Sequence, residues 1–389
     1  MVFDEGKMAS SAISEVLSRH PDWSDRKRAL FSNMFHDLIR WWRLLWTGAG
    51  RKPSTEDRWL WHVLGVLLLR WEDVPPRGHG FRGIPWERVR KRLERAGRIR
   101  AVRESIPDEL DLIGERELGN EWDRVLRALN SHPPLAVRAN RLKVDAGGLK
   151  DMLREEGLGS TRVRWAPDAL VLKRKTNIFR TSAFREGYLE VQDPASQAVA
   201  PFLDVRPGLR VIDACAGQGG KTLHLSALME NTGRIIAMDD VAWKLEMLKK
   251  RARRAGAFDI RTVHVSSPRS YRRFRGAYDR VLVDAPCSGL GSLRRNPDIK
   301  WSFSSESLDR LRELQRRLIS DYSGLVREGG KMVYATCSIL PSEGEEQVGW
   351  FLGSREGWVL EEERRFRPDV EGFDGFYMAR LLRKDGGAG

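Results

Sequence analysis

Apolar residues along this chain follow two different periods, and the change of period divides the sequence into two parts. Between about residues 8 and 128 they recur every three or four positions, as in 29–46 and 56–69, which predicts a set of amphipathic helices. Beyond that region, short apolar runs alternate with helical segments, which is typical of a doubly wound parallel sheet. The sequence His132-Pro133-Pro134 interrupts the helical pattern, so we expect a domain boundary there.

The second part begins with a short α/β pattern and continues with a longer one. Ser342 and Glu345 have the spacing of a capping box and predict the start of a helix there. The strands expected from both patterns lie at 135–143, 169–173, 188–191, 209–212, 234–238, 260–265, 280–283, 331–335 and, as a closing strand, 376–382. We therefore predict three domains, a helical domain over 1–130, a small α/β module over 131–190 and a Rossmann-like domain over 191–389.

The stretch from Leu209 to Thr222, LRVIDACAGQGGKT, has the order strand, glycine turn and helix that opens a nucleotide-cofactor fold. A phosphate-binding P-loop would need glycine where Cys215 stands, and a dinucleotide fingerprint would need glycine or alanine where Thr222 stands. Two interpretations remain. One is the S-adenosylmethionine loop of a Rossmann-like methyltransferase, and the other is a purely structural glycine turn.

Composition and charge narrow the choice of partner. The 389 residues carry a formal charge of +14, which predicts a polyanionic partner or a merely solvated basic surface. Residues 86–103 are strongly basic and predict a helix whose cationic face either follows phosphates or is solvated. Trp41 and Trp42 can form a platform for RNA bases, although packing in the core of the helical domain is the favoured interpretation.

Cysteine usage and hydropathy indicate the compartment. The three cysteines are too few for a disulfide framework, and no spacing typical of a zinc site occurs. The N-terminal residues lack the apolar core of a signal peptide, and the most apolar stretch, 59–69, is too short to cross a bilayer. We expect a reduced, cytoplasmic chain that holds no metal.

Acids and thiols follow the expected strands. In an open parallel sheet, ligands bind beyond the carboxyl ends of the strands, which gathers Asp213, Asp239, Asp284, Cys287 and Cys337 along one edge. Asp239 stands where an acid meets ribose hydroxyls in nucleotide folds. We expect the arginines at 294 and 295, which follow Cys287 closely, to contact phosphate.

Thiols at this edge suit one methylation chemistry. Carbon 5 of a pyrimidine is a poor nucleophile, and addition of a thiolate to carbon 6 turns it into an enamine-like carbon that can attack a methyl group. After transfer, the proton on carbon 5 must leave and the thiol must be expelled, and an acid is needed near ring nitrogen 3.

The motifs DACAGQGGKT, DAPCSGLGSLRRNPDIKW and YATCSILPSEGEEQV resemble those of RNA cytosine-5 methyltransferases of the RsmB/Fmu/Sun type. PLAVRANRLK and YLEVQDPASQ are similar to the small RNA-binding module of that family, and the N-terminal helices resemble its NusB-like region. The resemblance implies a class I methyltransferase fold, S-adenosylmethionine as cofactor, and RNA, rather than DNA or a membrane, as partner. It implies small-subunit (16S) ribosomal RNA as substrate. A transfer RNA enzyme with the same mechanism and a catalytically silent assembly factor are the alternatives.

The resemblance also implies residue roles. Cys337 would be the nucleophile on carbon 6, Cys287 would assist product release, and Asp284 would hold the cytosine edge close to the cofactor. Asp239 would take the ribose hydroxyls. The loop that would wrap the methionine and ribose parts of S-adenosylmethionine comprises Cys215, Ala216, Gly217, Gln218, Gly219, Gly220 and Lys221.

The chain departs from the family pattern at two places. Gly217-Gln218 stands where the family usually has alanine-proline. Ser267 occupies the position of the acid that commonly meets the adenine amino group, which weakens the expected adenine recognition and is the only support for the silent assembly factor.

Overall fold

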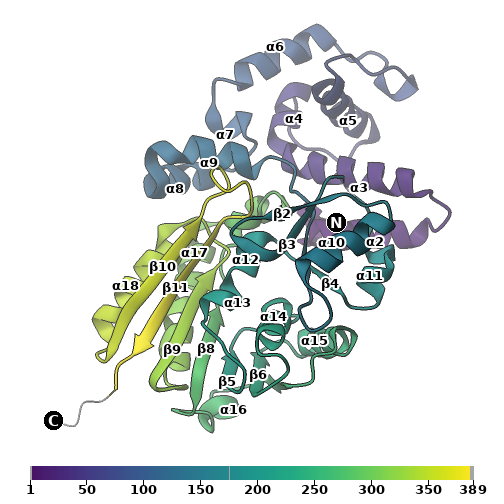
Figure 1. The fold of residues 1–389 in the computed structure, drawn as a ribbon. Helices are drawn as coiled ribbons and strands as arrows, with labels where there is room; N and C mark the ends of the chain where they lie inside the picture. The colour runs from purple at the N-terminus through teal and green to yellow at the C-terminus, as the bar shows by residue number, and fades with distance from the viewer. Residues whose placement is uncertain (1, 175, 386–389) are drawn as a thin grey trace. The chain divides into compact units, whose positions relative to one another are not determined.

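The computed structural model of this chain describes residues 2–174 and 176–385. Contacts between Cα atoms separate it into two compact units. The first, here called the helical unit, comprises residues 1–132 together with 293–307. The second, the sheet unit, comprises 133–292 and 308–389. Figure 1 shows the elements of both.

The helical unit is built from short amphipathic helices, as the three-to-four-residue spacing predicts. Its apolar core includes Leu45 and, at the spacing of one helical face, Val63, Val66 and Leu67. The helices are α1 (Val2–Glu5), α2 (Ala9–Arg19), α3 (Asp25–Arg40), α4 (Trp42–Ala49), α5 (Asp57–Glu72), α6 (Trp86–Ala96), α7 (Arg100–Arg103), α8 (Asp108–Leu118) and α9 (Trp122–Leu129).

The basic stretch 86–103 forms two helices where the sequence predicted one. Helix α6 ends at Ala96, and α7 begins at Arg100. Gly97 follows α6, and glycine is about 1 kcal/mol less favourable than alanine inside a helix. The tryptophans at 41 and 42 pack against the apolar core of the helical unit, in agreement with the favoured interpretation.

The segment 293–307 belongs to the helical unit by its contacts. Arg294 is 3% exposed and donates to the carbonyl of Ala128 at 3.0 Å. Lys300 is 1% exposed and donates to the carbonyl of Arg40 at 2.6 Å, and burial lowers its pKa well below the ordinary value. The expectation that the arginine pair begins a phosphate-contacting surface is therefore wrong for Arg294, because its side chain is buried and bound to protein.

The sheet unit begins with a small antiparallel sheet of order β2-β3-β1-β4. Leu149 and Leu153 of α10 (Ala146–Glu155) are buried in its core. The strands are β1 (Ala136–Ala139), β2 (Ser160–Val163), β3 (Ala166–Leu172) and β4 (Leu189–Val191). The first strand is shorter than predicted because Asn140 starts a turn, in which its carbonyl accepts from the amide of Lys143 at 2.8 Å.

The larger sheet has seven strands in the order β10-β11-β9-β8-β5-β6-β7. Neighbours from β7 to β9 are parallel, and β11 and β10 add an antiparallel edge, as Figure 1 shows in yellow. The strands are β5 (Arg210–Asp213), β6 (Arg234–Asp239), β7 (Ile260–His264), β8 (Tyr278–Asp284), β9 (Val326–Thr336), β10 (Trp358–Phe366) and β11 (Phe376–Arg383). This arrangement confirms the predicted Rossmann-like fold.

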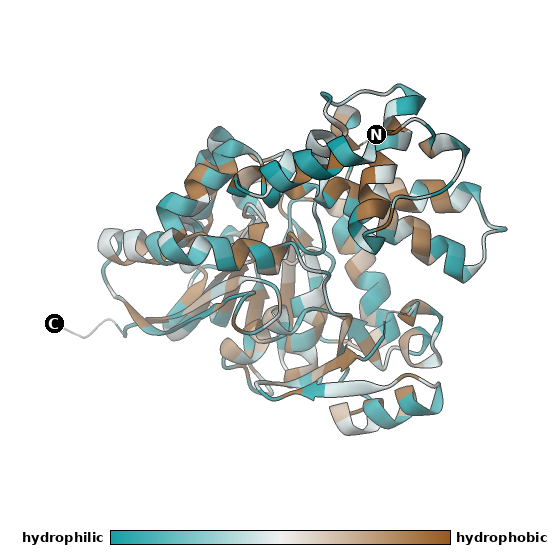
Figure 2. Cartoon of the chain, turned by 90° about the horizontal axis from the view of Figure 1, so that it is seen from above, coloured by the Kyte–Doolittle hydropathy of each residue, from teal (hydrophilic) through white to brown (hydrophobic). Residues whose placement is uncertain are grey.

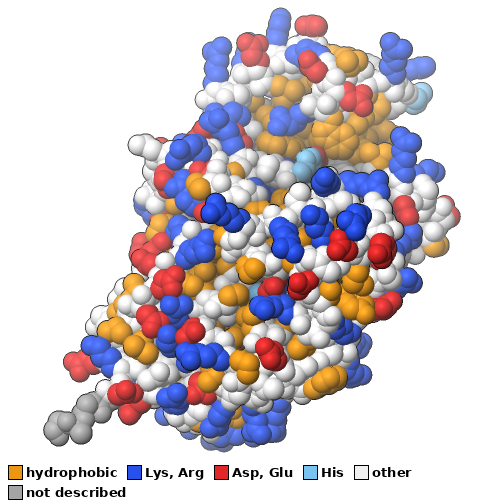
Figure 3. Space-filling model, viewed as in Figure 1, with side chains coloured by type: hydrophobic (Ala, Val, Ile, Leu, Met, Phe, Trp, Pro, Cys, Tyr) orange, Lys and Arg blue, Asp and Glu red, His pale blue; other side chains and the backbone are white. Residues whose placement is uncertain are grey.

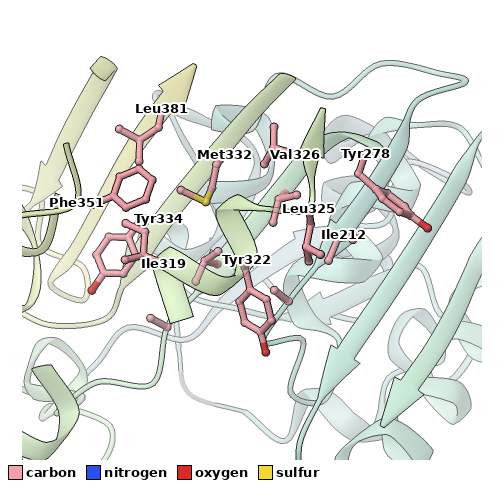
Figure 4. Packing of buried hydrophobic residues seen from close by; sticks show 14 of the residues in the cluster. Ile212, Tyr278, Ile319, Tyr322, Leu325, Val326, Met332, Tyr334, Phe351 and Leu381 are labelled. Atoms are coloured by element: carbon pink, nitrogen blue, oxygen red, sulfur yellow. The ribbon is translucent and has the colours of Figure 1, made fainter. Parts of the chain in front are cut away.

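Apolar residues fill both faces of the larger sheet. Successive strand residues point to opposite faces, so Val211 and Ile212 enter different clusters. On one face Ile319 of α17 (Ser305–Ser323) and Phe351 of α18 (Glu345–Ser354) pack against strand residues (Figure 4). On the other face Leu225 of α14 (Gly220–Leu228) contributes to the core. Figure 2 shows brown, apolar residues on many of the strands and both brown and teal residues on the helices. Among the described residues, none of the helices combines the length and apolarity that crossing a membrane requires.

Candidate active site

The glycine loop after β5 is shaped by two residues with positive φ. Gly217 has φ 53° and Gly219 has φ 86°. A Cβ at Gly219 would lie 2.5 Å from Cγ of Leu248, so a larger residue there would displace α15 (Ala242–Ala255). A Cβ at Gly217 would meet no atom within 4 Å, so the backbone at this point of the loop is open to a ligand.

Neighbouring elements hold the rest of the predicted cofactor loop. Ala216 donates its N–H to the carbonyl of Met238 at 2.8 Å. The carbonyl of Gln218 accepts from Arg251 of α15 at 2.9 Å. The carbonyl of Gly220 accepts from Arg138 of the small sheet at 2.7 Å. The loop is therefore fixed from both the large and the small sheet.

Arg138 is a residue that the sequence reasoning did not select. It is 2% exposed, and burial lowers its pKa to about 10. Besides Gly220, its guanidinium contacts Gln192. Its position in LAVRANRLK gave no chemical signal, because an arginine in a basic segment suggests an RNA contact rather than an anchor for the cofactor loop.

Asp213 is the last residue of β5, and Cys215 is the first residue of the predicted cofactor loop. Thr222 donates its hydroxyl to Oδ2 of Asp213 at 2.7 Å, and burial raises the pKa of this carboxyl to about 7. Its Oδ1 is buried without a hydrogen-bond partner in the structure. Cys215 packs against the apolar cluster shown in Figure 4, and burial raises the pKa of its thiol well above the ordinary value.

Asp239, at the end of β6, is 7% exposed and closes the loop from the other side. Its Oδ2 accepts from the amide of Gly217 at 2.8 Å, and its Oδ1 accepts from the amide of Val241 at 2.9 Å. Each carboxylate oxygen has a second lone pair, so this geometry leaves acceptors for ribose hydroxyls. Ser267 follows β7 on an exposed segment.

Lys221, the last residue of the predicted cofactor loop, forms an ion pair with Asp284. Its ammonium lies 2.6 Å from Oδ2 of Asp284, the last residue of β8. Burial alone would lower the pKa of Lys221, but the charge of Asp284 and the hydrogen bond to it raise that pKa overall. This ion pair thus connects the predicted cofactor loop to Asp284, the residue expected to hold the cytosine edge.

The two thiols meet just beyond the adjacent strands β8 and β9. Sγ of Cys287 lies 3.4 Å from Sγ of Cys337, and both cysteines are free. The hydrogen bond to Cys337, together with burial, raises the pKa of the Cys287 thiol well above its ordinary value. Cys287 is therefore a thiol at neutral pH, available to hold a proton at its sulfur.

Glu343 is a second residue that the sequence reasoning did not select. Its side chain is fully buried and accepts hydrogen bonds from Ser288 and Ser338, the residues that follow the two cysteines. The predicted capping box is wrong here, because α18 is preceded by Gly344 without a side-chain cap and Glu345 bonds to Arg365. Among the described residues, no cluster of His, Cys, Asp or Glu is suited to hold a metal ion.

The chain is similar in sequence to known methyltransferases. Residues 200–382 match the family profile described as 16S rRNA methyltransferase RsmB/F, and residues 115–179 match the ferredoxin-like domain of the same family. The probable ribosomal RNA small subunit methyltransferase B of Synechocystis is 36% identical over 90% of this chain and 86% of that protein. The ribosomal RNA small subunit methyltransferase B of Pseudomonas syringae is 32% identical over 69% of this chain.

That match spans 64% of the Pseudomonas protein, which is slightly less than two thirds of its length. Among solved structures, the crystal structure of PH0851 has a TM-score of 0.81 and 26% identity. The similarity covers 95% of this chain and 93% of that one. The likeness therefore extends over both the helical and the sheet unit.

Proposed function

Because the chain belongs to the RsmB/F family of S-adenosylmethionine-dependent methyltransferases, we propose that it methylates carbon 5 of a cytosine in small-subunit ribosomal RNA. The observation that carries the proposal is the pair of thiols 3.4 Å apart, at the ends of two adjacent parallel strands. One thiol would suffice to add to the ring, and the second gives the reaction a group that can act when the product leaves.

The glycine loop fits S-adenosylmethionine. The backbone at Gly217 is open, and Asp239 next to it offers carboxylate acceptors to ribose hydroxyls. The residues from Cys215 to Lys221 would hold the methionine part. When bound, the cofactor supplies an electrophilic methyl group.

The side chains divide the work on the base. Target bases have to leave their stack to reach a strand-end pocket. Cys337, as thiolate, forms a bond to carbon 6 and pushes the electron pair of the carbon 5–carbon 6 double bond toward the ring. Asp284, held by Lys221 at the end of β8, would bind the cytosine edge. After carbon 5 has gained its methyl group, loss of its proton restores the double bond and breaks the sulfur–carbon bond.

Cys287 is suited to this last step because of its place beside the nucleophile. Its sulfur lies within hydrogen-bond reach of Cys337, so a proton can pass between the two sulfurs as the adduct collapses. The leaving thiolate on Cys337 is then neutralised without a solvent proton, and the thiolate left on Cys287 takes the proton that leaves carbon 5.

We infer ribosomal RNA as the substrate from the names of the similar proteins, which are ribosomal RNA small subunit methyltransferases. The charge of +14 supports a polyanion, and Figure 3 shows Lys and Arg side chains spread over the visible face. An enzyme that modifies ribosomal RNA would work in the cytoplasm.

The test is methyl transfer from labelled S-adenosylmethionine to unmodified small-subunit RNA, followed by nucleoside analysis. We expect 5-methylcytidine with the wild-type chain and none with Cys337→Ala. Label on another atom, or on transfer RNA alone, would contradict the proposal. Bisulfite mapping of the product then identifies the nucleotide.

A further inference from the structure

The two Cys-Ser dipeptides are arranged alike. Cys287-Ser288 follows β8, and Cys337-Ser338 follows β9. The serine hydroxyls lie 3.4 Å apart, as do the two sulfurs. Each hydroxyl also accepts from the amide two residues further on, at 3.5 Å for Ser288 and 3.1 Å for Ser338.

One carboxylate joins the two dipeptides. Oε2 of Glu343 accepts the hydroxyl of Ser338 at 2.6 Å and also the hydroxyl of Ser288. Oε1 accepts the amide of Ser288 at 2.8 Å and the side-chain amide of Gln315 at 3.0 Å. The carboxylate therefore receives four donors, of which three belong to the residues next to the thiols.

The backbone of Glu343 is fixed as firmly as its side chain. Its carbonyl accepts the hydroxyl of Tyr334 at 2.9 Å and that of Thr336 at 3.3 Å, both from β9. The carboxylate of Glu343 is fully buried, and its desolvation is unfavourable unless hydrogen bonds offset it. Its presence here, with four donors, indicates a role that an apolar residue of similar size cannot fill.

We propose that Glu343 is a positioning residue, which holds the two thiols at their separation of 3.4 Å by binding the serine that follows each of them. The role deepens the proposed function and rests on it, because two sulfurs must act on neighbouring carbons of one ring. Misplacement by about 1 Å can cost on the order of 100-fold in rate. The negative charge of Glu343 also contributes, after Cys337 and burial, to the raised pKa of Cys287.

The kinetic test compares Glu343→Gln with Glu345→Gln in the full-length protein. The side-chain amide of glutamine accepts hydrogen bonds at its oxygen only. Its nitrogen is a donor and cannot accept a hydrogen bond from the serine hydroxyls or amides. We expect Glu343→Gln to lower kcat by at least about tenfold, while KM for RNA and Kd for S-adenosylmethionine stay within about twofold. Glu345→Gln removes the same charge two residues away, where Arg365 is the partner, and keeps the wild-type kcat.

A double-mutant cycle tests whether Glu343 acts through the serines. Ser338→Ala should lower kcat, and adding Glu343→Gln to it should cost less than Glu343→Gln costs alone. Wild-type kcat in Ser338→Ala, additive effects, or parallel loss of kcat and cofactor affinity would overturn the proposal. If Glu343→Gln does not fold, Ser338→Ala still decides the matter.

A chemical test of the thiol geometry does not depend on methyl transfer. Diamide removes two hydrogen atoms from a thiol pair and is itself reduced to the hydrazine, leaving a disulfide. We expect the 287–337 disulfide, identified by peptide mass, to form at least about fivefold more slowly in Glu343→Gln than in wild type or Glu345→Gln. Equal rates would overturn the positioning role. If the disulfide forms more slowly in Glu343→Gln but the wild-type chain makes no 5-methylcytidine, only the proposed function is rejected.

Discussion

The ammonium of Lys221 lies 2.6 Å from the carboxylate of Asp284, so the end of the glycine loop is bonded to the strand that leads to Cys287. The Lys221 side chain is 12% exposed and that of Asp284 is 27% exposed. We expect Lys221→Met to leave Asp284 without its cation and to slow methyl transfer by about 10- to 150-fold, since hydrogen bonds to charged groups are worth about 1.5–3 kcal/mol. Single-turnover kinetics measure the loss.

Lys249→Met is the matched control for this variant. Lys249 pairs with Glu246 at 2.7 Å, but both side chains are solvent-exposed, and surface pairs contribute little. Equal rates for Lys221→Met and Lys249→Met would exclude the Lys221–Asp284 pair from the reaction.

Asp239→Ala should weaken the binding of S-adenosylmethionine by about 1.5–3 kcal/mol, because a charge-assisted bond to ribose is lost. The variant also frees the amides of Gly217 and Val241, so the loop loses one of its anchors on β6. Titration calorimetry measures the change, and Asp240→Ala, on the exposed neighbour, is the control. Unchanged affinity would remove Asp239 from the cofactor site. Ser267→Asp is expected to tighten binding by restoring an acid near the adenine.

The basic face of α6 should contribute to RNA binding. Arg88, Lys91 and Arg95 are exposed and share one side of the helix by their spacing. We expect reversal of all three to glutamate to weaken RNA binding and to flatten its salt dependence, because phosphate contacts release counterions. Filter binding at several salt concentrations measures both. The same reversal at Lys249, Lys250 and Arg253 of α15 serves as the comparison, and an equal effect there would mean that only the net charge matters.

Sequence reasoning found the inner parallel strands β5, β6 and β8 because most of their residues are buried and form short apolar runs. It did not find β10, whose central residues read LEEERR, since this edge strand pairs on one side only and exposes most of its polar side chains. Hydrophobic periodicity carries no signal for such a strand. Strand ends and helix starts differed from prediction by a few residues, as at β1, where a turn made by Asn140 replaced the continued alternation.

At the candidate site, the motifs identified the residues that the structure brings together at the strand ends. They did not identify Glu343 or Arg138, because a glutamate in SEGEE and an arginine in a basic segment look like surface residues. Each has a hydrogen-bond partner that is distant in sequence, which is Ser288 for Glu343 and Gly220 for Arg138. The same reason explains Arg294, whose charge suggested a phosphate contact but whose guanidinium donates to the carbonyl of Ala128 in the helical unit.

His224 provides a pH-dependent test of the contact between the small sheet and α14. Its Nε2 lies 3.2 Å from Oδ2 of Asp168, and burial lowers the pKa of the imidazole to about 4. The pKa of histidine in an unfolded chain is about 6.5, and below it the unfolded chain binds a proton at His224 that the folded chain does not. The contribution of His224 to the free energy of unfolding therefore falls as the pH falls toward 4. The free-energy difference between wild type and His224→Gln should shrink by up to about 3 kcal/mol between pH 7 and pH 4. Urea unfolding at both pH values measures it, and a constant difference would show that His224 does not remain neutral in the folded chain.

Removal of each thiol alone should block a different step of the reaction. Cys337→Ala lacks the nucleophile, so methyl transfer is lost while S-adenosylmethionine still binds. Cys287→Ala keeps the nucleophile but lacks the neighbouring sulfur 3.4 Å away, so the adduct forms and collapses slowly. On a denaturing gel, Cys287→Ala should show a slow-migrating, nuclease-sensitive band when RNA and S-adenosylmethionine are present, and the double variant should lack it. A band from Cys337→Ala instead would exchange the two roles. Full activity in both single variants would exclude a thiol mechanism, because no sulfur would then be needed at carbon 6.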